Sequence, residues 1–422
     1  LRGGVISGDS AALYSGTITD AGTISGGILS GSGTTEVVSS GAVLANHTIG
    51  SGASATLLAN TSAARNIIIS GGTIDLYTNN TSNTTIVGTG GNFILESGVT
   101  FNATSGNYAT SGNTITVNSG AVLSGSRISS GGVINVNGGV ISSTVVDGGT
   151  LNVNKATSGT NNTTFTSNGG TVNLESGFAD TRSWTISNNV IFNVLSGAKI
   201  SDSFVQSGGL LDVSTGGSVN GTATISSGGT IDIPVISSGA KVVLQSGSIM
   251  SGLATVASAG ALSAASSYVY SGTITNYGAV YGGTLAGSAQ LIASGSGANS
   301  LTSGVSIESG GRLYLGSGAT GSANLVNGGT LEIASGATPS NNRFGSGTGG
   351  TIIIDSGATW SNANSAAYNV TSGNTLVIQS GGTVSGTVIA TGGTTVISSG
   401  GILAGTQTVS SGGTLVLNGT AG

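Results

Sequence analysis

Short segments with apolar residues at every second position recur along the whole chain. In residues 150–153, 230–233 and 330–333, two aliphatic side chains stand two positions apart and therefore point to the same face of an extended strand. The residue between them is Asn, Asp or Glu, which we expect to face water. Sustained 3.6-residue periodicity is lacking, so the pattern predicts β-strands of about 3 to 5 residues rather than helices.

Pairs of glycines separate these segments at regular intervals. The clearest series lies near the end of the sequence and consists of Gly381-Gly382, Gly392-Gly393, Gly400-Gly401 and Gly412-Gly413. The second glycines of these pairs are 11, 8 and 12 residues apart, so long and short arms alternate with a period of about 19 to 20 residues. Glycine at these points predicts corners, because it adopts backbone angles that other residues resist.

A strand this short cannot bury its apolar face alone, so successive coils must cover one another. We therefore predict an all-β fold, a right-handed parallel β-helix (β-solenoid) of about 20 coils, forming one domain over residues 1–422. Stacked coils lie about 4.8 Å apart, so we expect the domain to be rod-like. Irregular stretches predict loops at the corners, near residues 77–88, 155–168, 180–189 and 340–347.

Composition restricts the class of protein further. Charged residues make up 5% of the chain, and the net charge is −5. Basic residues do not cluster, so the chain lacks the positively charged patch that nucleic-acid binding requires. The chain has no cysteine, which excludes disulfides and thiolate metal sites. No apolar run approaches the roughly 20 residues that a membrane-spanning helix requires. The hydrophobic fraction of 37%, with its alternation, favours a folded core over a disordered Gly/Ser linker.

The alternating arms of residues 380–398 and 399–417 follow the patterns S-G-G-T-x-x-V and S-G-G-x-x-x-x-T-x-V, with replacements such as Ile389 and Leu417 for the final Val. They resemble the passenger domains of self-associating autotransporter adhesins. These are the diffuse-adherence type of Gram-negative bacteria, and the resemblance covers the chain from about Gly71 onward. It implies export across the outer membrane, display at the bacterial cell surface, and a role in adherence, cell aggregation or biofilm formation. Some members are similar in carrying sugars, often heptose, on Ser or Thr hydroxyls, which implies an O-glycosylating transferase as a partner.

Candidate interaction residues are those that we expect to point outward from the strands, together with a group of tyrosines. The set consists of Asp75, Asn152, Asn173, Asp212, Asp232, Glu332, Tyr268, Tyr270, Tyr277 and Tyr281. Tyrosine offers an apolar ring with a polar tip, which suits stacking on sugars or packing against a partner. The alternative for the tyrosines is an aromatic stack inside the coil.

Residues for catalysis or metal binding are sparse. A catalytic triad or a histidine metal site would depend on the single histidine, His47, for which we expect a surface or turn position. The outward acids from Asp75 to Glu332 are spread over more than 250 residues, whereas glycoside hydrolysis needs two carboxyl groups about 5 to 10 Å apart. No glycine pair is followed by the repeat-in-toxin calcium motif. We therefore expect no enzyme activity, no cofactor and no metal site.

Three functions remain open at this stage. The first is an extracellular adhesin whose outward polar side chains join laterally to another copy of the chain, or bind a host-cell or matrix surface. The second is a structural subunit of an extracellular filament or surface layer, joined end to end through unpaired strand edges. The third is a polysaccharide-cleaving β-helix, which requires clustered acids. We favour the adhesin at the cell surface, without a nucleic-acid partner and without a membrane-spanning segment.

Overall fold

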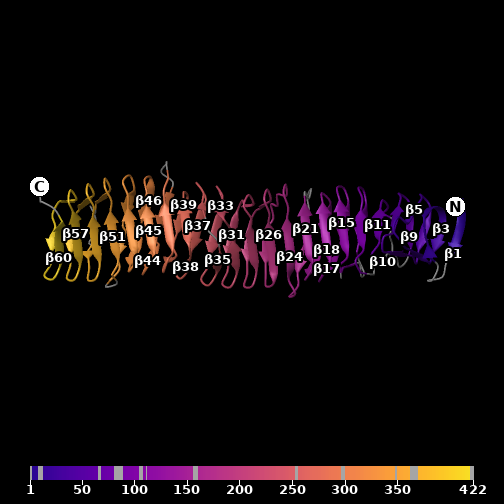
Figure 1. The fold of residues 1–422 in the computed structure, drawn as a ribbon, viewed down its shortest axis with the longest axis horizontal. Coiled ribbons are helices and arrows are strands. Elements are labelled where there is room, and N and C mark those ends of the chain that lie inside the picture. Colours follow the sequence, from indigo (N-terminus) through magenta and orange to yellow (C-terminus); the bar gives the residue numbers. More distant parts are fainter. Residues whose placement is uncertain are drawn as a thin grey trace. The chain divides into compact units, whose positions relative to one another are not determined.

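The computed structural model describes residues 2–7, 13–64, 68–79, 89–103, 108–110, 112–154, 160–251, 255–295, 300–346, 349–361 and 369–418. Every regular element in these residues is a β-strand, and the strands pair in parallel (Figure 1). The architecture is a β-solenoid with about 19 turns, close to the number that the repeat predicts. No helix in the described residues has the length and apolarity needed to cross a membrane.

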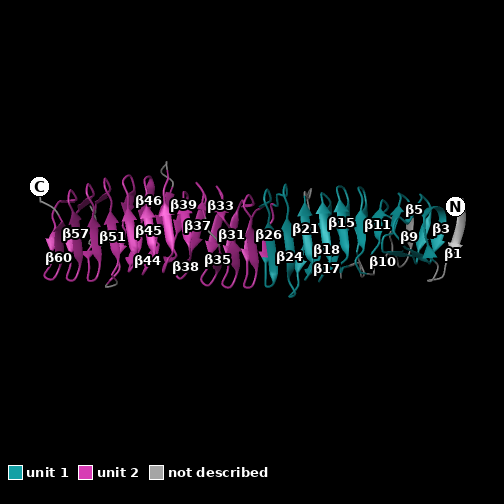
Figure 2. Ribbon diagram, in the orientation of Figure 1, with its two compact units in different colours: residues 1–180, 186–199 teal, residues 181–185, 200–422 magenta. Residues whose placement is uncertain are grey.

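Two compact units make up the chain, where the sequence predicts one domain (Figure 2). Unit 1 consists of residues 1–180 and 186–199, and unit 2 of residues 181–185 and 200–422. Both units are built from the same short strands and glycine corners, so the predicted architecture holds within each of them.

Ten strands of unit 1 form one continuous parallel sheet, which we call the spine sheet. They are β3 (Thr17–Ser25), β5 (Thr35–Val38), β8 (Ser54–Leu57), β11 (Thr73–Leu76), β12 (Asn92–Leu95), β15 (Thr114–Asn118), β18 (Val133–Asn137), β21 (Thr150–Asn154), β24 (Gly170–Leu174) and β26 (Val190–Val194). Two shorter sheets complete the turns that follow β12. The first contains β13 (Thr100–Asn102), β16 (Val122–Ser124), β19 (Val140–Ser142) and β22 (Thr160–Asn161), and the second contains β14 (Tyr108–Ala109), β17 (Arg127–Ser129), β20 (Val145–Asp147) and β23 (Thr164–Phe165).

The first turns of unit 1 carry their own small sheets. One contains β2 (Leu13–Tyr14), β4 (Ile28–Leu29), β7 (Thr48–Gly50) and β10 (Ile68–Ser70). β1 (Arg2–Ser7) and β6 (Val43–Ala45) pair with β3, and β9 (Ser62–Ala64) pairs with β6. The one histidine of the chain, His47, directly precedes β7.

Unit 2 contains a ten-stranded parallel sheet, which we call the long sheet. Its strands are β33 (Val235–Ile236), β36 (Thr255–Val256), β39 (Thr273–Asn276), β42 (Gln290–Ala293), β45 (Arg312–Leu315), β48 (Thr330–Ile333), β51 (Thr351–Ile354), β54 (Thr375–Ile378), β57 (Thr394–Ser398) and β60 (Thr414–Asn418).

The other strands of unit 2 complete the turns around the long sheet. One series is β28 (Ser203–Val205), β31 (Thr222–Ile225), β34 (Lys241–Leu244), β37 (Ala261–Ala264), β40 (Ala279–Tyr281), β43 (Ser300–Ser303), β46 (Ala319–Ser322) and β49 (Thr338–Ser340). Further short ladders contain β29 (Leu210–Val213), β32 (Thr230–Asp232) and β35 (Ile249–Ser251); β38 (Val269–Tyr270), β41 (Thr284–Leu285), β44 (Ser306–Glu308), β47 (Leu325–Asn327) and β50 (Arg343–Phe344); β52 (Thr359–Ser361), β55 (Thr383–Ser385) and β58 (Ile402–Ala404); and β53 (Asn369–Val370), β56 (Val388–Ile389) and β59 (Thr408–Val409).

Alternation along each strand builds the core. In β54, Leu376 and Ile378 are fully buried, whereas Thr375 and Val377 face outward and are half-buried. The register places Leu376 directly beside Ile352 of the preceding turn, so equivalent side chains stack in columns. Burying one such aliphatic side chain stabilises the fold by about 1.5–3 kcal/mol, and stacking repeats this gain in every turn.

The two glycines of a corner have different roles, as Gly392 and Gly393 show. Gly392 has a φ of 75°, in the left-handed region that favours glycine. Gly393 has an ordinary φ, but a methyl group on it would overlap the carbonyl oxygen of Val370 in the preceding turn. The first glycine therefore makes the bend, and the second lets neighbouring turns approach.

Strands continue through parts of three of the four predicted loops. β22 and β23 lie within the stretch predicted at 155–168, β25 (Trp184–Ile186) within 180–189, and β50 within 340–347. Residues 80–88, 155–159 and 347 of the predicted loops lie outside the described residues. Sequence irregularity at these places thus reflects degenerate repeats, since the backbone pairing of a strand does not require the Gly-Gly signature.

Candidate interaction surface

A continuous column of asparagines runs along the outer face of the spine sheet. Asn135, Asn152, Asn173 and Asn193 occupy equivalent positions of β18, β21, β24 and β26, and the strand register places each beside the next. Each Nδ2 donates to the Oδ1 of the preceding asparagine, at 2.8 Å for Asn152, 2.7 Å for Asn173 and 2.7 Å for Asn193. We call these four residues the asparagine column.

Hydrogen bonding within the asparagine column uses only part of its capacity. A primary amide has two N–H donors and an oxygen that accepts twice, whereas the ladder uses one donor and one acceptor site per link. All four side chains are half-buried and lie on the outer face. The column therefore offers both donors and acceptors to a partner at the inter-strand spacing of about 4.8 Å.

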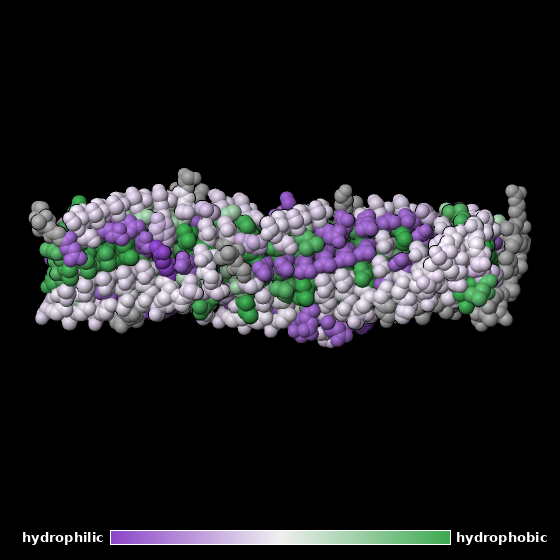
Figure 3. Space-filling view, viewed as in Figure 1, coloured by the Kyte–Doolittle hydropathy of each residue, from purple (hydrophilic) through white to green (hydrophobic). Residues whose placement is uncertain are grey.

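A second outward column lies beside the first. Asn118, Asn137 and Asn154 stack in register at the ends of β15, β18 and β21, and Asn118 Nδ2 donates to Glu96 Oε2 at 3.0 Å. Figure 3 shows hydrophilic bands along part of the surface of unit 1. Together the two columns give unit 1 an amide-rich face with few charges.

Two of the predicted residues, Asn152 and Asn173, belong to the asparagine column. Asp75 stands at the same position of β11, and the register carries this column through Ile94 and Thr116 to Asn135. Burial, followed by the charge of Glu96, raises the pKa of Asp75 above its ordinary value. The structure therefore brings these three predicted residues onto one face of unit 1.

The predicted acids of unit 2 occupy two separate places. Asp212 of β29 and Asp232 of β32 are register neighbours, and burial, followed by the charge of Asp232, raises the pKa of Asp212. Glu332 lies on β48 of the long sheet, where its carboxylate pairs with the guanidinium of Arg312. Asp212 and Asp232 thus form one outward carboxylate pair, and Glu332 belongs to a different cluster.

Tyr268 and Tyr270 are not surface residues, so their assignment to an interaction surface is wrong. Their side chains are 4% and 2% exposed, and their rings pack edge to face with centroids 5.2 Å apart. Tyr268 Oη accepts a hydrogen bond from Met250 N, and Tyr270 Oη donates one to Gly282 O, both at 3.1 Å. The hydroxyls are satisfied by backbone groups, which allows both rings to fill the core.

Tyr277 and Tyr281 remain on the surface of unit 2, with exposed fractions of 44% and 40%. Tyr281 ends β40, and Tyr277 follows directly after β39. The four tyrosines are therefore divided between a buried pair and an exposed pair. Alternation predicts that Tyr268 and Tyr270 share a face, but it does not place Tyr277 and Tyr281 on the same face as them.

His47 is buried at a corner, so the expected turn position is confirmed and the alternative of a surface position is wrong. Its side chain is 1% exposed, its ring stacks on Tyr14 with centroids 5.7 Å apart, and its Nδ1 lies 3.0 Å from the Gly26 carbonyl oxygen. The residue sits at a corner just before β7 and points into the coil. Among the described residues, no group of three or more His, Cys, Asp or Glu side chains is arranged to hold a metal ion.

An ion cluster at another face of unit 1 was not predicted. Asp147 Oδ2 accepts from Arg127 Nη2 at 2.6 Å and Nε at 3.0 Å, and Asp147 Oδ1 accepts from Asn168 Nδ2 at 2.8 Å and from the Thr166 hydroxyl. The Thr166 hydrogen bond, then those from Arg127 and Asn168, lower the pKa of Asp147 to about 2. Exposed ion pairs of this kind contribute little to stability.

Sequence reasoning also missed four residues that belong to the surfaces described above. Asn135 and Asn193 complete the asparagine column, and the central Asn in residues 134–136 and 192–194 is a usable signal for them once the strands are aligned. Arg312 and Tyr314 lie beside Glu332, and only the register of β45 against β48 brings them together.

No protein-family model matches the chain, and no curated protein is significantly similar to it in sequence. Among solved structures, the chain is similar to the crystal structure of a TibC-catalysed, hyper-glycosylated TibA55-350 fragment. The two share 20% sequence identity over 97% of each chain, with a TM-score of 0.25.

Proposed function

We propose that the chain is an extracellular adhesion module that associates with further copies of itself through the asparagine face of unit 1. The observation that carries this proposal is the asparagine column, in which three consecutive amide–amide hydrogen bonds leave a row of donors and acceptors facing outward. The role is non-enzymatic, and its place is the bacterial cell surface.

The asparagine column is complementary to itself. An amide is both donor and acceptor, so the same patch on two molecules can face each other in the isologous arrangement that is typical of two-fold contacts. Each hydrogen bond across such a contact contributes about 0.5–1.5 kcal/mol, which is weak alone. Many contacts along one column and many molecules on one cell supply the avidity that adhesion requires.

Low charge supports the same role. With 5% charged residues and a net charge of −5 over 422 residues, two molecules meet little like-charge repulsion. The Asn118–Asn137–Asn154 column widens the neutral face. Adhesion to a host-cell or matrix surface would use the same polar groups against a different partner.

Corner serines are the candidate positions for O-linked sugar. Ser246 and Ser267 occupy neighbouring corners of unit 2, both are exposed, and their hydroxyls are 2.8 Å apart. An exposed hydroxyl at a corner is accessible to a transferase, whereas hydroxyls on paired strands are partly covered by side chains of the neighbouring turns. Co-expression with a glycosyltransferase should raise the intact mass above 40.1 kDa and map the added mass to corner peptides.

Clumping of coated microspheres tests the adhesion proposal without other cell components. Microspheres that carry the wild-type chain should clump, and those that carry the double variant Asn152→Asp with Asn173→Asp should stay dispersed. In the variant, each contact between two molecules would bring four added carboxylates together, and their charges repel. The matched control is Ser124→Asp with Ser142→Asp, register neighbours on the outer side of β16 and β19. Dispersed wild-type microspheres, or equal clumping of both double variants, would refute the proposal.

A further inference from the structure

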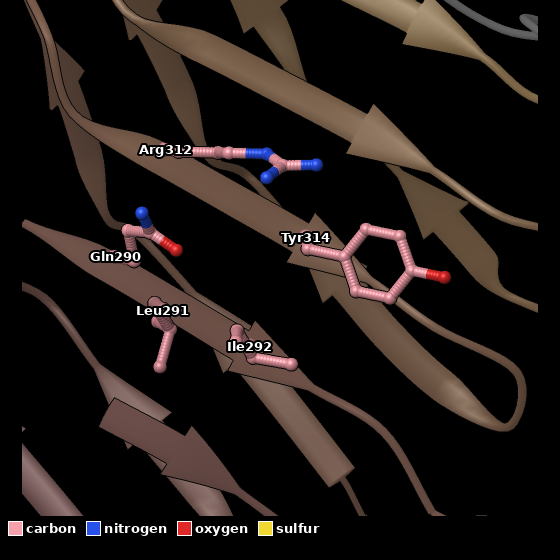
Figure 4. Close-up of a pocket in the computed structure, with 5 residues that line it drawn as sticks. All are labelled: Gln290, Leu291, Ile292, Arg312 and Tyr314. Carbon is pink, nitrogen blue, oxygen red and sulfur yellow. The ribbon is translucent and has the colours of Figure 1, made fainter. Parts of the chain in front are cut away.

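A shallow pocket opens on the outer face of the long sheet in unit 2. It lies over β42 and β45, has a volume of about 240 Å³, and is lined by Gln290, Leu291, Ile292, Arg312 and Tyr314 (Figure 4). The strand register places Gln290 beside Arg312 and Ile292 beside Tyr314. The volume corresponds to about eight water molecules in the liquid, which is room for one small cyclic ligand.

The ring of Tyr314 lies against the sheet rather than standing away from it. A methyl group on Gly316 would come within 3.1 Å of Tyr314 Cε1, so the ring extends over a glycine that leaves space for it. Figure 4 shows the ring face-on, with the Arg312 side chain on one side of it and the Ile292 side chain on the other. Tyr314 is half-buried, and its outward ring face forms a flat apolar platform.

Polar and charged groups border one side of this platform. Arg312 forms an ion pair with Glu332, the register neighbour of Tyr314 on β48, and their side chains are 45% and 18% exposed. Burial, followed by the charge of nearby Glu332, raises the pKa of Asp355 above its ordinary value. Guanidinium, carboxylate and the Gln290 amide thus provide both donors and acceptors.

We propose that this pocket binds one neutral pyranose residue of a glycan. A pyranose has an apolar C–H face that stacks on an aromatic ring, and hydroxyls at its edge that both donate and accept hydrogen bonds. Tyr314 with Ile292 matches the first requirement, and Arg312, Glu332 and Gln290 match the second. Two carboxyl groups beside one guanidinium leave no net positive charge, so an acidic sugar is disfavoured.

This site goes beyond self-association through the asparagine column, because it lies on unit 2 and takes a different ligand. The chain would then carry two adhesive functions, one directed to its own copies and one to a glycan. Loss of either function by substitution should leave the other unchanged, which makes the two proposals separable.

Saturation-transfer NMR with the full chain tests the proposal. The probes are methyl α-mannoside, methyl β-galactoside and N-acetylglucosamine as neutral pyranosides, with N-acetylneuraminic acid as the acidic comparison. At least one neutral probe should bind with a millimolar Kd, and the acidic sugar should bind at least about ten-fold more weakly. Absence of saturation transfer to all three neutral probes, or preference for the acidic sugar, would overturn the proposal.

Substitutions of the platform distinguish it from unspecific binding. Tyr314→Ala should weaken binding by at least about ten-fold, whereas Tyr314→Phe keeps the ring and should stay within about three-fold of wild type. Gly316→Val should also weaken binding, because its side chain displaces the ring. Tyr77→Ala, which removes an exposed tyrosine of unit 1, is the control and should bind normally. Unchanged binding by Tyr314→Ala with an unchanged circular dichroism spectrum would also overturn the proposal.

Discussion

Glu36 and His47 lie against each other inside unit 1, with Glu36 Oε2 3.4 Å from His47 Nε2 and both side chains fully buried. Despite this proximity, neither atom has a hydrogen-bond partner among the described residues. Burial, followed by the charge of Asp20, raises the pKa of Glu36 to about 7, and burial lowers the pKa of His47. The interior thus favours the neutral form of each group, and stability should depend on pH.

Replacing Glu36 should remove one part of that pH dependence. The folded chain keeps the Glu36 proton up to about pH 7, whereas the unfolded chain loses it near pH 4.5. The contribution of the Glu36 carboxyl to stability is therefore fully present below pH 4.5 and is lost as the pH rises to about 7. This loss lowers the free energy of unfolding by about 3 kcal/mol. His47 acts in the opposite sense, since its contribution is present above pH 6.5 and is lost as the pH falls.

Urea unfolding of wild type and Glu36→Gln at pH 4.5 and pH 8 measures the Glu36 contribution, because His47 is present in both proteins. The variant should gain about 3 kcal/mol relative to wild type between these two pH values. Glu175→Gln, on the outer face of unit 1, should follow the wild-type trend. Parallel pH curves for wild type and Glu36→Gln would show that the buried carboxyl has an ordinary pKa.

Gly283 should be far less tolerant of alanine than Gly272. Both glycines have positive φ, 79° and 70°, so alanine introduces backbone strain of about 1–2 kcal/mol at either position. A methyl group on Gly283 overlaps the ring of Tyr270, whereas nothing lies within 4 Å of one on Gly272. Gly283→Ala should therefore destabilise the chain by at least about 2 kcal/mol more, measured by urea unfolding. Equal losses would mean that Tyr270 moves freely.

The asparagine column should also contribute to stability. Asn173 accepts from Asn193 and donates to Asn152, so Asn173→Ala removes two links at once. We expect a loss of about 1–2 kcal/mol in the free energy of unfolding, because the groups are half-buried and water replaces part of each hydrogen bond. Asn137→Ala, on an exposed position of β18, should cost less than half as much. A larger loss at Asn137 would contradict a stabilising ladder.

The repeat predicted the fold because its physical requirements are local. Each glycine pair marks a corner, and each alternating segment marks a strand. Equivalent residues of neighbouring turns stand side by side, as Leu376 and Ile352 do, because one face of every strand must be buried. Strands β22 and β50 escaped prediction because they lack flanking glycine pairs, and pairing with neighbouring turns holds them instead.

The candidate surface was less predictable, because it depends on the register between strands of neighbouring turns. Asn152 and Asn173 follow from alternation, but the ladder to Asn135 and Asn193 needs the register. Alternation put Tyr268 and Tyr270 together, yet it does not say which face of a strand is buried. His47 lies at a turn, which is one of its two expected positions, but the sequence does not show that its ring points into the coil and stacks on Tyr14.

Cross-linking measures most directly whether the spine sheets of two molecules face each other. The chain has no cysteine, so Thr171→Cys places a single thiol on β24 beside an intact asparagine column. Packed sheets lie about 10 Å apart, so a bismaleimide of about that reach should trap dimers. We expect covalent dimers with Thr171→Cys and few with Ser142→Cys on β19, because lateral association brings the two spine sheets together. Equal dimer yields from both positions, or none from Thr171→Cys at concentrations where microspheres clump, would contradict it.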